Sequence, residues 1–331
     1  MKQKVKQEDK FYWWKKHKDD VPFYRWIQGK DPSTPKIMLA PEKCWTNVDH
    51  DIYRTHNFIH ILHGAYDYSD YKKVLPEDIV KKIVIWPTYF AHWSMSRAIT
   101  FTYNKPNEQE YKSLFVCLNH KPRPHRVRFI DDLAKFDLLD KNFYSWHGDP
   151  YGDNLEVELK YWKEEKVILD VLNQNTSPVQ NFWPKEMDLS VINLVTETFD
   201  AGPFVTEKTF RCFLYKKPFI IYGPPGIHHK LLEWGFKLPK KIINYSFDLI
   251  EDHAKRREAI CKELQRLSKK DFNILAKKLK PTTEYNLQIF YRLIKNKKII
   301  PQIALEDSYY AQEIQQSIDN IDRLTKSNFA P

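Results

Sequence analysis

The sequence contains little glycine, with 8 glycines in 331 residues. It has neither the GxGxxG fingerprint of dinucleotide-binding folds nor the GxxxxGKS/T loop of P-loop enzymes. A Rossmann-type dehydrogenase and a P-loop kinase are therefore disfavoured. Four of the glycines fall in one stretch, at positions 202, 223, 226 and 235. Since glycine allows tight turns and close backbone approaches, this stretch is where the backbone turns most sharply.

Cysteine is scarce as well, and Cys44, Cys117, Cys212 and Cys261 lie far apart without a CxxC pair. We expect reduced, mostly buried thiols. No apolar run approaches the ~20 residues that a membrane-spanning helix needs. The charged amino terminus lacks the apolar region of a signal peptide. These absences predict a cytoplasmic protein without a membrane partner.

The composition predicts a folded globular protein, with 42% hydrophobic and 15% aromatic residues. The formal net charge is +10. A positive surface favours polyanions such as nucleic acid or nucleotide phosphates, although a lysine-rich composition in general would give the same charge. Because the basic residues are dispersed, charge alone does not identify a nucleic-acid-binding protein.

The stretch from residue 189 to residue 226 reads as strand, loop, helix, strand and turn. Residues 189–195 and 218–222 are short apolar runs typical of buried strands. Between them, Thr206 can cap a helix that begins with Glu207 and Lys208. Such a unit brings an acid, a base and free helix N–H groups to the carboxyl ends of parallel strands, where open α/β sheets bind nucleotides.

Strands alternate with helices along the chain, which predicts an α/β fold with parallel sheets. Further strands are expected at 37–40, 82–86, 97–103, 113–118 and 242–245, and further helices at 127–136, 155–172, 227–234 and 249–279. A polar break at 104–110 separates two domains, 1–106 and 110–285. Residues 286–331 form a helical tail that we expect to pack back across both domains.

A resemblance to a known family rests on three segments. Residues 205–211 (VTEKTFR) and 217–223 (KPFIIYG) resemble the donor-site motif of GT-B glycosyltransferases, in forms closest to α-1,3-fucosyltransferases, exostosin-like enzymes and small phage or giant-virus glycosyltransferases. Residues 119–126 (NHKPRPHR) are similar to the strand, loop and arginine that open the donor domain in those families. The resemblance covers about residues 113–250. It implies two Rossmann-like domains whose parallel sheets face a cleft, with domain 110–285 binding a nucleotide sugar and domain 1–106 on the acceptor side.

The donor diphosphate needs cations, because negative charge builds on the leaving group as the glycosidic bond breaks. Arg126, Arg123 and Lys208 are the candidates, together with the helix N-terminus near Thr206. The alternative is a solvated basic loop for the two arginines and an ordinary first helical turn for Glu207 and Lys208.

The resemblance assigns Glu207 to the ribose hydroxyls of the donor. Glu197 meets the sugar or a loop, and Gly223 closes the site after the second strand. Arg211 lies one turn after Glu207 and either shares its face or forms a structural salt bridge.

An inverting enzyme needs a catalytic base from the amino-terminal domain. Asp67 and Asp70 are our candidates, because they lie in a turn rich in glycine and tyrosine after an apolar run. Glu42, Asp49 and Asp51 remain alternatives near expected strand ends.

Three histidines, His56, His60 and His63, would share one face of a helix and could bind a metal there. On a strand they would not converge, and no flanking acidic ligand completes a site. We therefore expect no metal and no cofactor, with the nucleotide sugar acting as substrate. The aromatic residues of segment 1–30 either stack on bases or sugars or pack against the body of the protein.

These observations predict a metal-independent glycosyltransferase that is monomeric and uses a nucleotide-sugar donor. The basic charge and the amino-terminal aromatics favour DNA with a hydroxymethylated pyrimidine as acceptor, as in a phage enzyme acting in the host cytoplasm. A glycan or protein hydroxyl is the alternative acceptor. The competing class is a non-catalytic nucleic-acid-binding protein.

Overall fold

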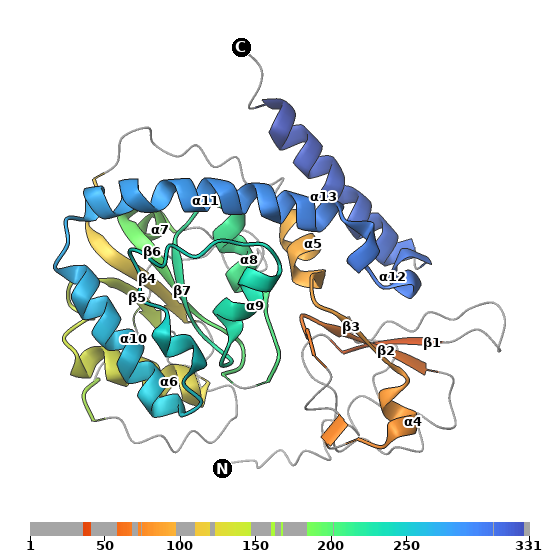
Figure 1. Ribbon diagram of the computed structural model, residues 1–331, viewed down its shortest axis with the longest axis horizontal. Coiled ribbons are helices and arrows are strands. Elements are labelled where there is room, and N and C mark those ends of the chain that lie inside the picture. Colours follow the sequence, from red (N-terminus) through yellow and green to blue (C-terminus); the bar gives the residue numbers. More distant parts are fainter. Residues whose placement is uncertain are drawn as a thin grey trace.

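The computed structural model describes part of the chain, namely residues 36–40, 58–67, 72–73, 75–96, 110–119, 123–146, 160–162, 167, 184–200, 202–306 and 308–327. These residues form an α/β fold with two parallel sheets, which confirms the predicted α/β class with parallel sheets (Figure 1). The expected strand at 97–103 and the aromatic segment 1–30 lie outside the described residues.

The first sheet belongs to the amino-terminal half of the chain. It has the strands β1 (Lys36–Ala40), β2 (Phe58–His63) and β3 (Ile83–Trp86), parallel and in that order. The short helix α4 (Glu77–Val80) precedes β3, and α5 (Tyr89–Ser96) follows it. The strands predicted at 37–40 and 82–86 are confirmed.

The second sheet has the strands β4 (Ser113–Asn119), β5 (Phe143–Trp146), β6 (Ser190–Thr196) and β7 (Phe219–Tyr222). All are parallel, in the order β5-β4-β6-β7. Their side chains are buried almost continuously, as expected for a parallel sheet covered on both faces. The strands predicted at 113–118, 189–195 and 218–222 are therefore confirmed.

Helices cover both faces of this second sheet. On one face lie α6 (Pro124–Lys135) and α10 (His253–Ser268), and on the other α8 (Glu207–Leu214), α9 (Ile227–Glu233) and most of α11 (Phe272–Lys295). Side chains of β7 alternate accordingly, since Ile220 packs with α6 and α10 whereas Phe219 packs with α8 and α11. The short helix α7 (Lys185–Leu189) leads into β6.

The carboxyl-terminal helices join the two halves of the chain. Helix α11 continues through residues 285 and 286, where we expected the tail to begin, and the 3₁₀ helix η3 (Lys297–Ile299), α12 (Gln302–Glu306) and α13 (Ser308–Ser327) follow. Helix α13 packs against α5 and α11. Trp86 of β3, Phe219 of β7, Phe290 of α11 and Tyr310 of α13 belong to one hydrophobic core, so the first sheet, the second sheet and the tail share buried apolar surface. Figure 1 shows α13 beside α5 and the end of α11.

The strand predicted at 242–245 is wrong. Those residues form a turn that leads into the 3₁₀ helix η2 (Ser246–Leu249), and β7 is the edge of the sheet. At this edge a side chain binds the strand, because the Ile221 N–H donates to His228 Nε2 at 3.1 Å. His228 Nδ1 lies 2.7 Å from Asp248 Oδ1, which fixes the ring. An imidazole therefore takes the place of a neighbouring strand.

The helix predicted at 155–172 is contradicted at its described positions. The backbone N–H groups of Lys160, Tyr161 and Trp162 all donate to the Asp131 carboxylate, at 2.8–3.3 Å. Val167 forms an antiparallel bridge with Trp146. The buried Asp131 carboxylate holds this backbone in a non-helical path. Its hydrogen bonds outweigh the local sequence pattern that predicted a helix.

Candidate functional site

The carboxyl ends of β4 and β6 form the candidate site. The chain leaves β4 for β5 on one side and later returns to β6 on the other, so the strand order changes direction between β4 and β6. Open parallel sheets bind ligands in the crevice at such a point. The two strand ends are tied together, because the Thr196 hydroxyl donates to Asn119 Oδ1 at 2.5 Å.

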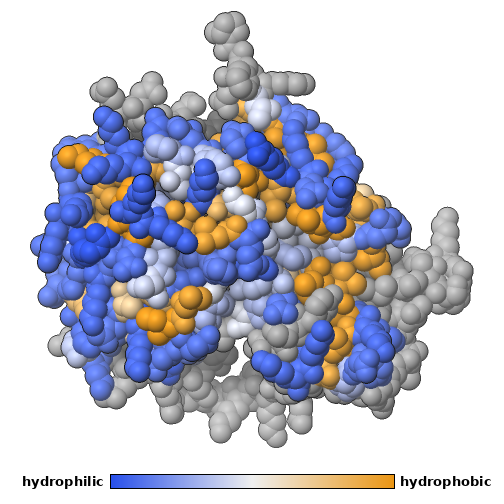
Figure 2. All heavy atoms as spheres, in the orientation of Figure 1, coloured by the Kyte–Doolittle hydropathy of each residue, from blue (hydrophilic) through white to orange (hydrophobic). Residues whose placement is uncertain are grey.

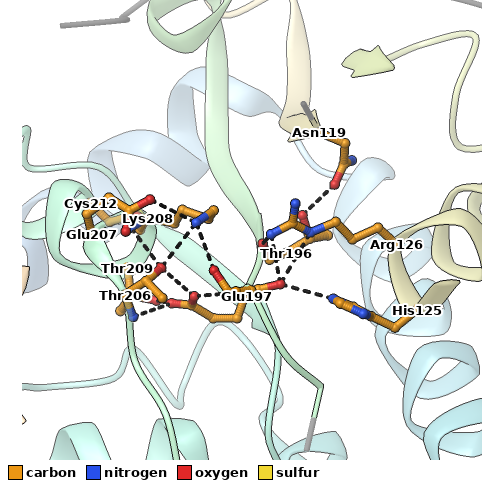
Figure 3. Close-up of polar contacts among 11 residues, drawn as sticks. Asn119, His125, Arg126, Thr196, Glu197, Thr206, Glu207, Lys208, Thr209 and Cys212 are labelled. Atoms are coloured by element: carbon orange, nitrogen blue, oxygen red, sulfur yellow. Dashed lines mark hydrogen bonds and ion pairs between the residues drawn. The ribbon is translucent and has the colours of Figure 1, made fainter. Parts of the chain in front are cut away.

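The first turn of α6 contacts the end of β6. Arg126 Nη2 donates to the carbonyl oxygens of Thr196 at 3.2 Å and Glu197 at 3.0 Å, and His125 Nε2 lies 3.0 Å from the same Glu197 oxygen (Figure 3). Burial, with Arg123 nearby, lowers the pKa of Arg126 to about 10, and burial lowers the pKa of His125 to about 4. Arg126 therefore stays a cation at neutral pH, and its guanidinium binds backbone carbonyls.

Glu197 follows β6 and is fully buried. Its Oε1 accepts from Thr206 N at 3.1 Å and Thr209 Oγ1 at 2.6 Å, and its Oε2 accepts from Thr198 N at 3.1 Å and Thr206 Oγ1 at 2.6 Å (Figure 3). All four partners are donors, which is the arrangement that an ionised carboxylate satisfies. Glu197 thus joins the end of β6 to the first turn of α8.

Gly223 makes this arrangement possible at the end of β7. A Cβ at this position would lie 3.1 Å from Glu197 Cβ and 3.2 Å from its Cγ, closer than ordinary carbon contacts. The residue that we expected to close a ligand site therefore makes room for the Glu197 side chain.

The start of α8 agrees with the sequence prediction. Thr206 is the N-cap, and its hydroxyl accepts from Lys208 N at 3.3 Å. Lys208 Nζ donates to Thr198 Oγ1 at 3.1 Å and to Glu207 Oε1 at 2.8 Å. Burial alone would raise the pKa of Glu207, but Lys208 and Arg211 beside it hold that pKa below its usual value. The acid and the base of the motif therefore form an ion pair.

The carboxyl end of β2 meets this region from the first sheet. Tyr66 N donates to the Pro203 carbonyl and Val205 N to the Gly64 carbonyl, each at 3.0 Å. Gly64 has φ +79°, and a Cβ there would overlap the Val205 carbonyl oxygen, so both the backbone angle and the space require glycine. The carboxyl end of β2 therefore contacts the loop between β6 and α8, and Asp67 is exposed directly after this contact.

The structure brings together most of the residues predicted for the donor site. Glu197, Thr206, Glu207, Lys208, Arg126 and Gly223 all lie at the carboxyl end of β6 or directly beside it. Arg123 is at the N-cap position of α6 without a side-chain capping bond, and its guanidinium lies 4.8 Å from the centre of the Phe199 ring. Asp70 lies outside the described residues.

Sequence reasoning did not select Asn119, His125, Thr196, Thr198 and Thr209 as parts of this network. Asn119 and His125 stand in the loop that carries the family resemblance, which was an available signal. The three threonines gave none, since only the fold shows that each hydroxyl lies beside Glu197, Lys208 or Asn119.

His60 and His63 lie on strand β2, not on a helix, and no group of three potential metal ligands occurs in the described part of the chain. Cys117, Cys212 and Cys261 are buried free thiols, as predicted. None of the described helices is both long and apolar enough to cross a membrane.

Comparison of the chain with protein-family models, curated proteins and solved structures gave no match.

Proposed function

We propose that this protein is a glycosyltransferase of the GT-B type that binds a nucleotide-sugar donor at the carboxyl end of β6. One observation carries the proposal: the carboxyl end of β2 contacts the loop between β6 and α8 through two backbone hydrogen bonds, and the start of α8, with Lys208, follows this loop directly. A donor bound to one sheet would face residues of the other. The family resemblance of residues 205–223 supports the same site.

The residues divide into those that hold the site and those that bind the donor. Lys208 has a side chain 31% exposed, so its ammonium can contact the diphosphate in addition to its protein partners. Arg123 is half-buried beside Phe199 and can add a second cation. Arg126 is only 4% exposed and binds carbonyl groups, so we assign it a positioning role.

In the proposed reaction, Asp67 acts on the acceptor while Lys208 and Arg123 contact the donor. The acceptor hydroxyl gives its proton to the Asp67 carboxylate while its oxygen forms a bond to the anomeric carbon. The bond from that carbon to the diphosphate breaks, and the nucleoside diphosphate leaves with the electron pair. Lys208 and Arg123 stabilise the charge that develops on the diphosphate.

For the acceptor we propose DNA that carries a hydroxymethylated pyrimidine. The net charge of +10 favours a polyanionic acceptor. Figure 2 shows hydrophilic side chains spread over this face of the described surface, not gathered in one patch. A DNA acceptor predicts transfer that weakens steeply as salt rises. A glycan or protein acceptor predicts transfer without DNA and with little salt dependence.

The first test is thermal unfolding of the full chain with ADP, GDP, UDP and CDP. At a concentration one hundred times Kd, a bound nucleotide stabilises the folded state by about 2.7 kcal/mol, which raises Tm by a few degrees. We expect one nucleotide to act, Lys208→Ala to remove most of its effect, and Lys277→Ala, an exposed lysine on α11, to retain it. No stabilisation by any nucleotide, together with salt-sensitive DNA binding, would instead favour the non-catalytic nucleic-acid-binding protein.

A further inference from the structure

Three carboxylates lie where β6 and β7 end, and they differ in what they can still bind. Glu197 is 0% exposed and accepts four hydrogen bonds within the protein. The side chain of Glu207 is 10% exposed and paired with Lys208. The side chain of Asp200 is 26% exposed. Of the three, Asp200 therefore has the most surface open to a ligand.

The Asp200 side chain is held from several elements. Its Oδ2 accepts from the Tyr222 hydroxyl at 3.3 Å and lies 2.8 Å from His253 Nδ1, at the start of α10. Its main-chain carbonyl accepts from Arg256 Nη2 at 2.9 Å. Both the carboxylate and the backbone of this loop residue are thus fixed, which lowers the entropy lost when a ligand binds.

One oxygen of this carboxylate remains available. Oδ1 accepts no hydrogen bond from the described residues, and the ring nitrogen Nδ1 of His125 lies 4.0 Å from it. An ionised carboxylate can accept about four hydrogen bonds, so Asp200 can take further donors on Oδ1. Two adjacent hydroxyl groups, as in a ribose, supply such donors.

We propose that Asp200, and not Glu207, binds the ribose hydroxyls of the nucleotide donor. The inference rests on the proposed function. Arg123 supports the placement, because its guanidinium lies over Phe199, the residue before Asp200. If the phosphates of a nucleotide contact Arg123, the adjacent ribose lies within reach of Asp200. Tyr222 and His253 act as positioning residues that orient the Asp200 carboxylate.

The test compares ribonucleotides with their 2′-deoxy forms by titration calorimetry. ADP, GDP, UDP and CDP and the four corresponding 2′-deoxynucleoside diphosphates are titrated into wild-type protein, Asp200→Asn and Glu207→Gln. We expect wild type to bind one ribonucleotide about 10- to 100-fold more tightly than its deoxy form, as a hydrogen bond to a charged group provides. This ratio should fall to near 1 in Asp200→Asn and persist in Glu207→Gln.

The other results have definite meanings. The assignment is overturned if the ratio persists in Asp200→Asn or is lost in Glu207→Gln. Equal binding of the ribo and deoxy forms by wild type also overturns it. All three results leave the glycosyltransferase proposal standing. No nucleotide binding by wild type overturns both. If Asp200→Asn does not fold by circular dichroism, His253→Gln replaces it: weakened positioning should lower the ratio at least several-fold, and an unchanged ratio contradicts the proposal.

Discussion

Replacing Glu197 with glutamine keeps the shape of the side chain but turns one carboxylate oxygen into an NH₂ group. The two carboxylate oxygens each accept from a backbone N–H, Oε1 from Thr206 and Oε2 from Thr198, both at 3.1 Å. In either orientation of the amide, the NH₂ group therefore faces a buried N–H that cannot accept a hydrogen bond. Rotation of nearby hydroxyl groups does not remove this conflict.

The size of the effect follows from these contacts. A buried donor left without its partner costs about 1–3 kcal/mol, and each remaining hydrogen bond weakens when its acceptor becomes neutral. Removing the cost of burying a charge offsets part of this loss. We expect Glu197→Gln to lower the free energy of unfolding by about 2–4 kcal/mol, near the upper end for single substitutions.

Urea unfolding followed by circular dichroism measures this change, with an unaltered slope m showing that the midpoint reports stability. The matched control is Glu284→Gln on α11, an exposed glutamate that we expect to change stability by less than about 0.5 kcal/mol. A loss below about 1 kcal/mol for Glu197→Gln would refute the view that Glu197 organises the site. If such a variant lost nucleotide binding while keeping its stability, Glu197 would be a ligand-binding residue instead.

Three further substitutions test other parts of the structure. In Arg126→Lys the ammonium cannot reproduce the planar set of hydrogen bonds to two carbonyls. The free energy of unfolding should fall by about 2 kcal/mol and Tm should fall with it, and an unchanged Tm would contradict the positioning role. Burial lowers the pKa of His92 to about 3. Between pH 6.5 and pH 3 the imidazole of His92 therefore binds a proton in the unfolded chain but not in the folded one. The free energy of unfolding is highest above pH 6.5 and falls by about 1.4 kcal/mol for each pH unit below it. Urea midpoints from pH 7.5 to pH 5 should show a smaller fall for His92→Gln, and parallel curves would oppose this assignment. Replacing His228 with phenylalanine leaves the Ile221 N–H at the edge of β7 without its acceptor and removes the imidazole contact of the buried Asp248, which keeps only two backbone donors. The change should cost about 3 kcal/mol in the same assay, and a loss under about 1 kcal/mol would mean that water covers the edge equally well.

The sequence determined the elements whose signals are local. Continuous apolar runs identified β4, β6 and β7, and threonine before Glu207 identified the start of α8. Gly235 ends α9 with φ +88°, as glycine after a helix predicts. These features depend on residues within a few positions of each other, so a short segment of the sequence is enough to predict each of them.

Only the tertiary structure decided what the candidate site residues do. The motif pointed to Glu197, Glu207 and Arg126, but spacing does not show that Glu197 is enclosed by threonines or that Arg126 binds the carbonyls at the end of β6. The strand predicted at 242–245 is absent for a similar reason, because the His228 imidazole, held by Asp248 from 20 residues further on, binds the Ile221 N–H at the sheet edge. The local sequence pattern determines which helices and strands form. Hydrogen bonds between residues distant in sequence determine which polar groups are paired inside the protein and which can still bind a ligand.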